Sequence, residues 1–479
     1  MHSHVKPVSP TLLIVALATA EMTCAIEHNM IFAVITALYK TYGDPVRVGW
    51  LITAFLLTSS GAAAIGGRLG DLYGRNRVLI CMVAVALVGS LIGLLGPSLE
   101  WVIAGRALQG ASMAILPLCY GLLRENLSRE RASYAIGVLA SVYSVGAGVG
   151  WVFGGIVVDH GHWRDIFYYS SSLAAIALVL VWRFVPASAR LPSARLDVFG
   201  GLLFLPAITL ALLGITLAKY RGWLDLQIWV FIGAGVLLLV MWVRRELRHE
   251  QPLINVRLLG TRQIGLSNLT FLLLGIGPLT YAAVFFPLLQ QPTWTGVGLG
   301  ISATAASLLQ IPTIAVAIAA ALWSGSVASR AGARYALLAG CVVQASGFVL
   351  LAFFHTTLWG VMLLLFVATG GMNIIFTTVP MLILDAAPVD RSSEATGLVQ
   401  VVRSVGLAVG AQVIAFLLGS EHVQNLAMGA GSLPAPSAYN RAFAEIALCS
   451  ILLIPLSFAL PRQHKSRRST NGTVTEVLY

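Results

Sequence analysis

The chain has 479 residues, of which 58% are apolar and only 10% are charged, whereas soluble domains carry about 25% charged residues. This composition excludes a water-soluble enzyme, which needs a charged surface, and a disordered chain, which lacks so many apolar residues. The formal net charge is +11, but the basic residues lie in short segments between apolar runs. Nucleic-acid binding is therefore not expected, and the composition predicts a polytopic membrane protein.

Fourteen stretches are long and apolar enough to cross a bilayer as helices, which takes about 20 residues each. In chain order, we expect spans near 11–38, 48–66, 78–97, 101–123, 132–158, 165–185, 198–218, 227–243, 263–289, 298–324, 336–354, 358–384, 395–418 and 441–460. The predicted fold class is an all-α polytopic membrane protein. The first stretch imitates a signal peptide, with Ala18-Thr-Ala20 in place of a cleavage site. Its apolar run continues to Tyr39, so we expect a retained helix.

The basic residues predict the orientation of the chain. With a cytoplasmic N-terminus, the inner segments hold 22 Lys and Arg residues and the outer segments hold 6. This asymmetry predicts a multi-pass protein of the cell inner (plasma) membrane with both termini in the cytoplasm. The five cysteines form no CxxC and lie in apolar stretches, so disulfides and metal binding are not expected.

An internal repeat relates two parts of the chain. Residues 131–150 match residues 391–410 at ten of twenty positions without a gap. A weaker match relates residues 67–77 to residues 325–335. Both matches map spans 1–6 onto spans 9–14, so spans 7 and 8 are an insertion. Paired halves of this kind are typical of secondary transporters, with a site between the halves near the middle of the membrane.

The repeat predicts four parts of the chain. We expect an N-terminal six-helix bundle over residues 1–186, a two-helix insertion with its linker over 187–245, a C-terminal six-helix bundle over 246–462, and a cytoplasmic tail over 463–479.

Several motifs resemble those of the major facilitator superfamily. The segment after span 2, Gly67-Arg-Leu-Gly-Asp71-Leu-Tyr-Gly74-Arg75-Asn-Arg77, resembles the signature loop of that family. Its glycines suit a tight loop, and Asp71 with the two arginines can form a charge latch at the membrane surface. Ser329 occupies the position of Asp71 in the second half, so the second latch is expected to be weak.

Two further motifs lie in spans 4 and 5. Arg106-Ala-Leu-Gln109-Gly110 is similar to the RxxQG motif of the family. Span 5 is similar to the family's antiporter motif, in which small residues allow close helix packing; its small residues are Gly137, Gly146, Gly150, Gly154 and Gly155. Trp151 stands where the family usually has proline, so the usual kink is not predicted. This tryptophan either closes the path between the two sides or fills a packing gap.

The fourteen spans with a central pair resemble the drug:proton antiporter branch of the superfamily (the QacA/EmrB type). The resemblance implies a proton-coupled exporter of amphipathic small molecules or drugs that works by rocking its two halves. Its partners are then a small-molecule substrate, protons and membrane lipids, with a monomer as the expected state. A narrow-range metabolite or lipid exporter, a proton symporter and a non-transporting membrane sensor remain alternatives. Neither catalysis nor a cofactor is expected, since motifs such as the ATP-binding loop are missing from the sequence.

Ionisable residues inside predicted spans are costly and mark functional sites. Glu27 stands where the branch has an aspartate, and we expect it to carry the proton, with Glu21 as the second candidate and Arg106 as the basic residue of the proton-coupling site. The two acids lie on different faces of their helix, so a carboxylate pair is not expected. The alternative is a fixed buried ion pair between either acid and Arg106.

Other polar residues in the spans are candidates for the wall of a substrate cavity. They are His28, Gln109, Gln310, Asn373 and Arg403. Arg403 aligns with Tyr143 in the repeat, so it is specific to one half. The alternative for each of these residues is a structural role, in which it joins neighbouring helices.

Overall fold

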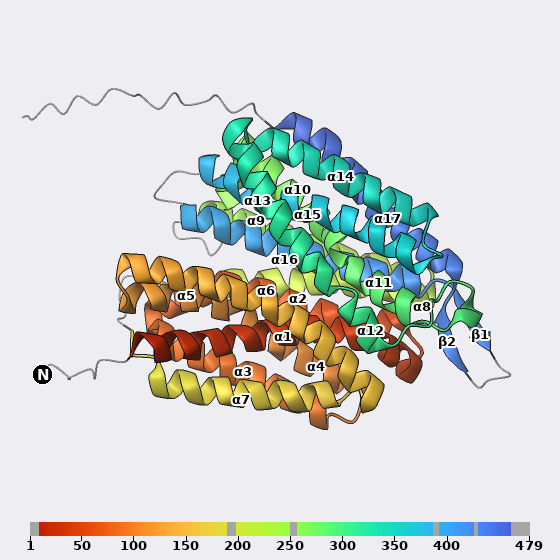
Figure 1. Cartoon of the computed structure of the whole chain (residues 1–479), viewed down its shortest axis with the longest axis horizontal. Coiled ribbons are helices and arrows are strands. Elements are labelled where there is room, and N and C mark those ends of the chain that lie inside the picture. Colours follow the sequence, from red (N-terminus) through yellow and green to blue (C-terminus); the bar gives the residue numbers. More distant parts are fainter. Residues whose placement is uncertain (1–8, 189–197, 250–255, 387–391, 426–429, 461–479) are drawn as a thin grey trace, which may run out of the picture.

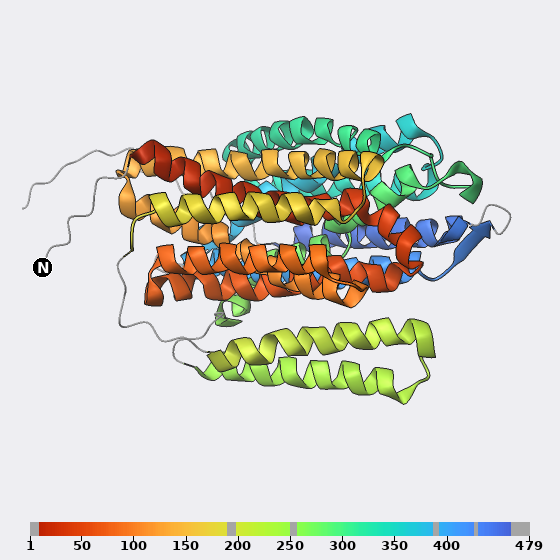
Figure 2. The same cartoon turned by 90° about the horizontal axis from the view of Figure 1, so that it is seen from below.

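The computed structural model describes residues 9–188, 198–249, 256–386, 392–425 and 430–460, apart from some side chains within the helices. The first half consists of α1 (Pro10–Tyr42), α2 (Pro45–Tyr73), α3 (Arg75–Leu95), α4 (Leu99–Gln109), η1 (Gly110–Ala114), α5 (Ile115–Asn126), α6 (Arg129–His160) and α7 (Asp165–Phe184). α8 (Val198–Arg221) and α9 (Leu226–Arg248) follow as a hairpin that lies beside the other helices (Figure 2).

The second half contains several broken helices. Its elements are η2 (Val256–Gly260), α10 (Arg262–Ile276), η3 (Pro278–Thr280), α11 (Tyr281–Gln290), η4 (Thr293–Thr295), α12 (Ala303–Leu308), α13 (Ile311–Arg330), α14 (Ala333–Phe353), α15 (Leu358–Ala386), α16 (Ser392–Leu418) and α17 (Pro436–Ala459). Strands β1 (His422–Asn425) and β2 (Ala430–Pro434) pair antiparallel between α16 and α17. We call the end of the molecule with these strands the hairpin end and the opposite end the terminal end (Figure 1).

Each predicted span coincides with a helix or with a pair of short helices. Among the described residues, twelve helical segments are long and apolar enough to cross a membrane. α2 and α8 are not among the twelve, and the described apolar part of α8 is the shorter run Leu203–Ala218. The all-α membrane fold is confirmed, whereas the count of fourteen crossings stays a prediction.

The internal repeat reappears in the way the helices pack. In the first half, α1 packs against α6 and α7, and α3 packs against α4 and α7. In the second half, α10 packs against α16 and α17, and α14 packs against α15 and α17. These are the pairs that the offset of the repeat relates to one another. The two groups of helices lie in separate parts of Figure 1.

The predicted signature loop is wrong in its extent. Residues up to Tyr73 belong to α2, and Arg75 already begins α3, so Gly74 alone forms the turn. Gly74 has a φ of 92°, and the repeat-related Gly332 has a φ of 109°, a backbone region that favours glycine. Arg75 forms an ion pair with Glu125 at 3.0 Å. The side chain of Asp71 lies outside the described residues, so the predicted latch stays untested.

The paired helices α8 and α9 are attached to both halves near the hairpin end, which is the end with strands β1 and β2. Thr216 of α8 accepts a hydrogen bond from Trp50 Nε1 of α2 at 2.9 Å and one from Gln412 Nε2 of α16 at 2.9 Å. Gln412 in turn accepts from the hydroxyl of Thr53 at 3.2 Å. One chain of hydrogen bonds therefore joins the first half, the insertion and the second half.

Candidate functional site

Glu27 lies at the centre of a buried polar network inside the first half. Its Oε1 atom accepts hydrogen bonds from Ser90 of α3 at 3.0 Å and from Ser170 of α7 at 3.2 Å. The two serine hydroxyls are 2.6 Å apart, and Gln109 Nε2 donates to both of them. Among the described residues, no hydrogen bond reaches the Oε2 atom of Glu27, although the side chain of Ser112 lies beside this carboxyl group. The carboxyl group is thus fully enclosed, with one oxygen engaged and the other free.

Arg106 holds the backbone around this network. Its Nη1 atom donates to the backbone carbonyl of Glu27 at 2.7 Å and to Gln109 Oε1 at 2.8 Å, and its Nε atom donates to the carbonyl of Leu51 at 3.2 Å. The guanidinium group also lies over the ring of Phe55, 4.4 Å from the ring centre. Arg106 therefore joins α4 to α1 and α2, and its closest contact with Glu27 is to the main chain.

Among the described residues, neither acid of α1 forms a direct ion pair with Arg106, although Glu27 and Arg106 interact electrostatically. Glu27 uses serine hydroxyls, and both carboxyl oxygens of Glu21 are buried without a hydrogen-bond partner. Glu21 lies on another side of α1, where it acts electrostatically on Cys119, Tyr120 and Tyr143. The two acids have different neighbours and do not pair with each other, as the helical spacing predicts.

A cavity of about 90 Å³ lies between the two halves. α1, α2 and α6 line one side of it, and the η3–α11 segment and α16 line the other. Its lining includes His28, Asn29, Trp151, Thr280 and Tyr281 among apolar side chains. The ring of His28 packs against Phe55 with 5.1 Å between ring centres, and its Nδ1 atom has no hydrogen-bond partner. Of the five residues predicted to line a cavity, His28 therefore lies in the wall of this one.

Arg403 lies one helical turn from this cavity, since it precedes the lining residue Leu407 by four positions on α16. Its guanidinium group lies 5.3 Å from the centre of the Phe376 ring, and its Nε atom has no hydrogen-bond partner. Arg403 also interacts electrostatically with Tyr143 of α6. These two residues occupy equivalent positions of the repeat, so the repeat brings them together across the interface between the halves.

The other predicted cavity residues lie in three different surroundings. Gln310 is fully buried between α12 and α13, where its amide lies beside the hydroxyl group of Tyr281. Asn373 donates to the carbonyl of Thr369 in its own helix α15 at 2.8 Å. Gln109 is fully buried in the Glu27 network and is not part of the cavity lining, which corrects the prediction for this residue.

The small residues of α6 form the surface that packs against α1. A Cβ atom on Gly146 would lie 2.7 Å from Ala25 Cβ, and one on Gly154 would lie 2.7 Å from the carbonyl oxygen of Met30. A Cβ atom on Gly150 would lie 3.1 Å from the backbone of Ile26. The surroundings of Gly67 and Gly137 lie outside the described residues, whereas Gly110 packs against the backbone of α2.

The second half repeats this packing between α16 and α10. A Cβ atom on Gly406 would lie 2.7 Å from the carbonyl oxygen of Leu272, and one on Gly410 would lie 2.0 Å from that of Ile276. In α6, Trp151 continues the helix without a break and faces Phe286 of α11, with 6.2 Å between ring centres. This tryptophan therefore packs across the interface between the halves.

Asp159 joins the two halves at the hairpin end. Its Oδ1 atom accepts from the backbone N–H of Ala303 at 3.0 Å, and its Oδ2 atom accepts from that of Thr304 at 2.7 Å. A carboxylate at the N-terminus of α12 accepts from N–H groups that have no partner within the helix, and it interacts favourably with the positive end of the helix dipole. Gly155, one turn earlier in α6, packs directly against Ala303. The halves are therefore closed against each other at this end.

We expect Asp159→Ala to shift the protein toward a state that is open at the hairpin end. The substitution removes two charge-assisted hydrogen bonds, which are worth about 1–3 kcal/mol each. Spin-label distances between the hairpin ends of α6 and α12 should lengthen in a larger fraction of molecules. Asp165→Ala is the matched control, because Asp165 accepts only from the backbone of His162 within its own half. Equal distance distributions in wild type and Asp159→Ala would contradict this role.

Sequence reasoning missed several residues of these sites. Ser90 and Ser170 gave no signal, because serines are common in membrane helices and their contact with Glu27 is tertiary. Glu445, an acid inside the predicted span 441–460, could have been found from its position alone. It is half-buried in α17, where Cys449 Sγ donates to it at 3.4 Å and its Oε2 atom has no partner.

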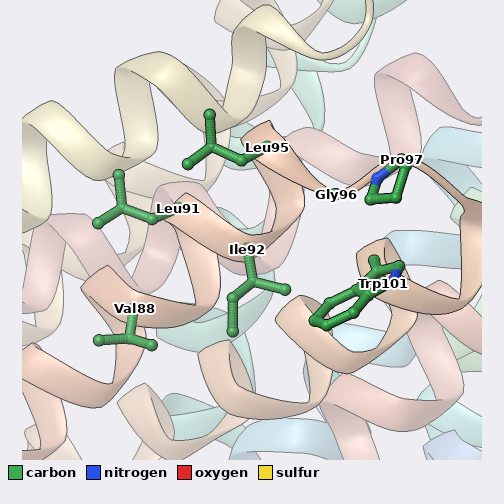
Figure 3. A pocket seen from close by; sticks show the side chains of 7 residues that line it. All are labelled: Val88, Leu91, Ile92, Leu95, Gly96, Pro97 and Trp101. Atoms are coloured by element: carbon green, nitrogen blue, oxygen red, sulfur yellow. The ribbon is translucent and has the colours of Figure 1, made fainter.

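A second hollow lies on the outer side of α3 and α4. It has a volume of about 320 Å³, and Figure 3 shows its lining of Val88, Leu91, Ile92, Leu95, Gly96, Pro97 and Trp101. This lining offers no charged side chain, and Leu95 is 77% exposed. Such a surface suits contact with lipid, which leaves the cavity between the halves as the candidate substrate site.

Comparisons with known proteins agree with this architecture. The sequence pattern of the Major Facilitator Superfamily matches residues 17–411. The chain is 28% identical to the cephamycin export protein CmcT of Amycolatopsis lactamdurans, over 96% of this chain and 94% of that protein. It is 27% identical to the tetracenomycin C resistance and export protein of Streptomyces glaucescens, over 98% of this chain and 86% of that protein.

Solved structures of transporters share the fold. The partially occluded inward-open xylose transporter XylE from E. coli matches with a TM-score of 0.62 and 11% identity, over 95% of this chain and all of that chain. A peptide transporter POT in complex with sulfate matches with a TM-score of 0.67 and 14% identity, over 93% of this chain and 94% of that chain.

Proposed function

Because the chain belongs to the major facilitator superfamily, we propose that this membrane transporter exports amphipathic small molecules in exchange for protons. The chain covers most of the length of two relatives that are named as export proteins for antibiotics. Such a protein moves a substrate across the membrane and transforms no substrate chemically, so it is not an enzyme. The finer proposals concern the proton, the direction and the substrate.

The buried carboxyl group of Glu27 is the observation that carries proton coupling. Burying an isolated charge in a membrane protein is expensive. One oxygen of Glu27 accepts from two serines, while Oε2 has no partner. A proton on Oε2 would neutralise the carboxyl group without breaking any of the observed hydrogen bonds. Glu27 therefore has a place for one exchangeable proton, with Ser90, Ser170 and Gln109 holding the group in position.

The closed hairpin end supports alternating access. The asymmetry of Lys and Arg residues supports an orientation in which this end lies outside the cell and both termini lie in the cytoplasm, in the inner (plasma) membrane. Asp159 and the contacts of α2 with α16 hold the halves together at this end. In the proposed cycle, rocking of the bundles 1–186 and 246–462 opens this end and separates Thr216 of the insertion 187–245 from Trp50 or Gln412; no role is proposed for the tail 463–479.

Transport of substrate in proteoliposomes tests the proposed function. With the purified protein in vesicles, a pH gradient should drive uptake of an amphipathic drug into the compartment that is more acidic, and drug movement should move protons the opposite way. Uptake toward the more alkaline side would indicate a symporter instead. Binding without any flux would indicate a membrane sensor. A panel of drugs, metabolites and lipids then distinguishes a broad exporter from a narrow one.

A further inference from the structure

Several polar groups in or beside the wall of the central cavity form no hydrogen bond with the described residues. Arg403 Nε and Trp151 Nε1 are buried and form no hydrogen bond. Both side chains can only donate. His28 Nδ1 is also buried without a partner among the described residues. Native proteins leave few buried polar groups unsatisfied, and exceptions call for an explanation. A ligand that accepts hydrogen bonds would satisfy these groups.

The charge near the cavity is positive. Arg403 and Arg106 both act electrostatically on His28, and Arg106 also interacts with the carboxyl group of Glu27, which leaves Arg403 as the cation without a neighbouring acid in the part of the chain that the structure describes. Among the described residues, Arg403 forms no ion pair; its guanidinium group lies over the ring of Phe376 and interacts electrostatically with Tyr143 and His28. The carboxyl group of Glu27 is turned toward Ser90 and Ser170 inside the first half. Glu21 is fully buried and also makes no contact with Arg403.

Apolar side chains complete the lining. Phe32, Ile52 and Leu56 from the first half face Leu407 and Ala411 from the second. The volume of about 90 Å³ is below the roughly 300–1,000 Å³ of pockets for whole drug-sized ligands. In this state the cavity thus accepts only part of such a molecule, and a charged group of the same molecule can reach Arg403 one helical turn away.

We propose that the central cavity selects amphipathic anions, and that Arg403 binds their carboxylate. A planar guanidinium group binds a carboxylate through two parallel hydrogen bonds, which gives both affinity and orientation. The apolar part of the molecule packs between Phe32 and Leu407, and Trp151 Nε1 offers a further donor. This inference rests on the proposed function and names its substrate class. Arg403 is specific to the second half, since Tyr143 occupies the equivalent position of the first.

Matched ligands test the selection by charge. Each of several naphthyl and biphenyl scaffolds is prepared as a carboxylate, as a neutral amide and as an amine, and binding is measured by calorimetry with the full-length protein in detergent. We expect the carboxylate to bind tightest. Arg403→Met should weaken its binding about 10- to 100-fold, the range for a lost hydrogen bond to a charged group, and should leave the amide nearly unaffected.

Two variants control this experiment. Arg403→Lys keeps the charge without the two-pronged geometry and should recover part of the carboxylate affinity. Arg330→Met removes a positive charge from an exposed residue at the terminal end of α13 and should bind like wild type. Unchanged amide binding by Arg403→Met shows that this variant is folded. If Arg403→Met has also lost amide binding, the test is the comparison of Arg403→Lys with wild type. Equal carboxylate affinity of these two proteins would overturn the proposal.

The outcomes separate this inference from the proposed function. Tightest binding of the amine, or unchanged carboxylate binding by Arg403→Met, would overturn the assignment to anions and leave export intact. Failure of all scaffolds to bind, together with failure of the drug panel to show flux in proteoliposomes, would overturn both.

Discussion

Replacing Glu27 by glutamine is expected to reduce pH-driven transport to the background of empty vesicles. Glutamine has nearly the same shape, and its carbonyl oxygen can still accept from Ser90 and Ser170 at the positions seen for Oε1. It cannot take up or release a proton, so only the coupling is removed. Exchange of labelled for unlabelled substrate, which needs no net proton movement, should continue. The measurement compares pH-driven uptake with such exchange in the same vesicles.

Two further variants decide whether the effect belongs to Glu27. Glu100→Gln makes the same chemical change at an exposed acid of the first half, which pairs with Arg47 on the surface, and should transport like wild type. Glu21→Gln changes the other buried acid of α1 and should keep most of the coupling. Full pH-driven uptake by Glu27→Gln, or its loss in Glu21→Gln alone, would refute the assignment of the proton to Glu27.

Gly410→Ala is expected to destabilise the protein strongly. The added Cβ atom would lie 2.0 Å from the carbonyl oxygen of Ile276 and 2.6 Å from its carbonyl carbon, and both atoms are backbone. α16 and α10 would have to move apart, and overpacking of this kind costs about 1–3 kcal/mol or more. We expect a lower yield of monodisperse protein and a lower unfolding temperature in detergent. Both are measured by fluorescence-detected gel filtration, the second after heating.

A graded series of glycines controls this prediction. Gly150 is the repeat-related residue of the first half, and its added Cβ would approach Ile26 only to 3.1 Å, so Gly150→Ala should destabilise less. Gly325 lies in α13 with no atom within 4 Å of an added Cβ, so Gly325→Ala should be neutral or stabilising by about 0.5–1 kcal/mol. If all three variants unfold at one temperature, close packing at these glycines does not determine stability.

The sequence predicts the helices well because long apolar runs have few alternatives in a membrane. It also predicts the small-residue surfaces of α6 and α16, since spacings of four keep residues on one face of a helix. It does not predict the partners of Glu27, because Ser90 and Ser170 come from α3 and α7 and depend on how the bundle packs. For Gln109 the sequence predicts a polar residue inside a span but not the direction in which its side chain points, so it does not distinguish the cavity from the Glu27 network.

The insertion has a further consequence for how compounds reach the interface between the halves. Two bundles that face each other have two lateral boundaries. Here α2 and α16 form the first boundary, and α6 forms the second one together with α12 and α13. α8 lies over the first boundary and is bonded to Trp50 and Gln412 on its two sides. Molecules dissolved in the bilayer therefore meet an uncovered boundary only beside α6. Compounds that enter from the lipid phase would therefore do so beside α6, and residues along α6 and α13 would determine which compounds pass.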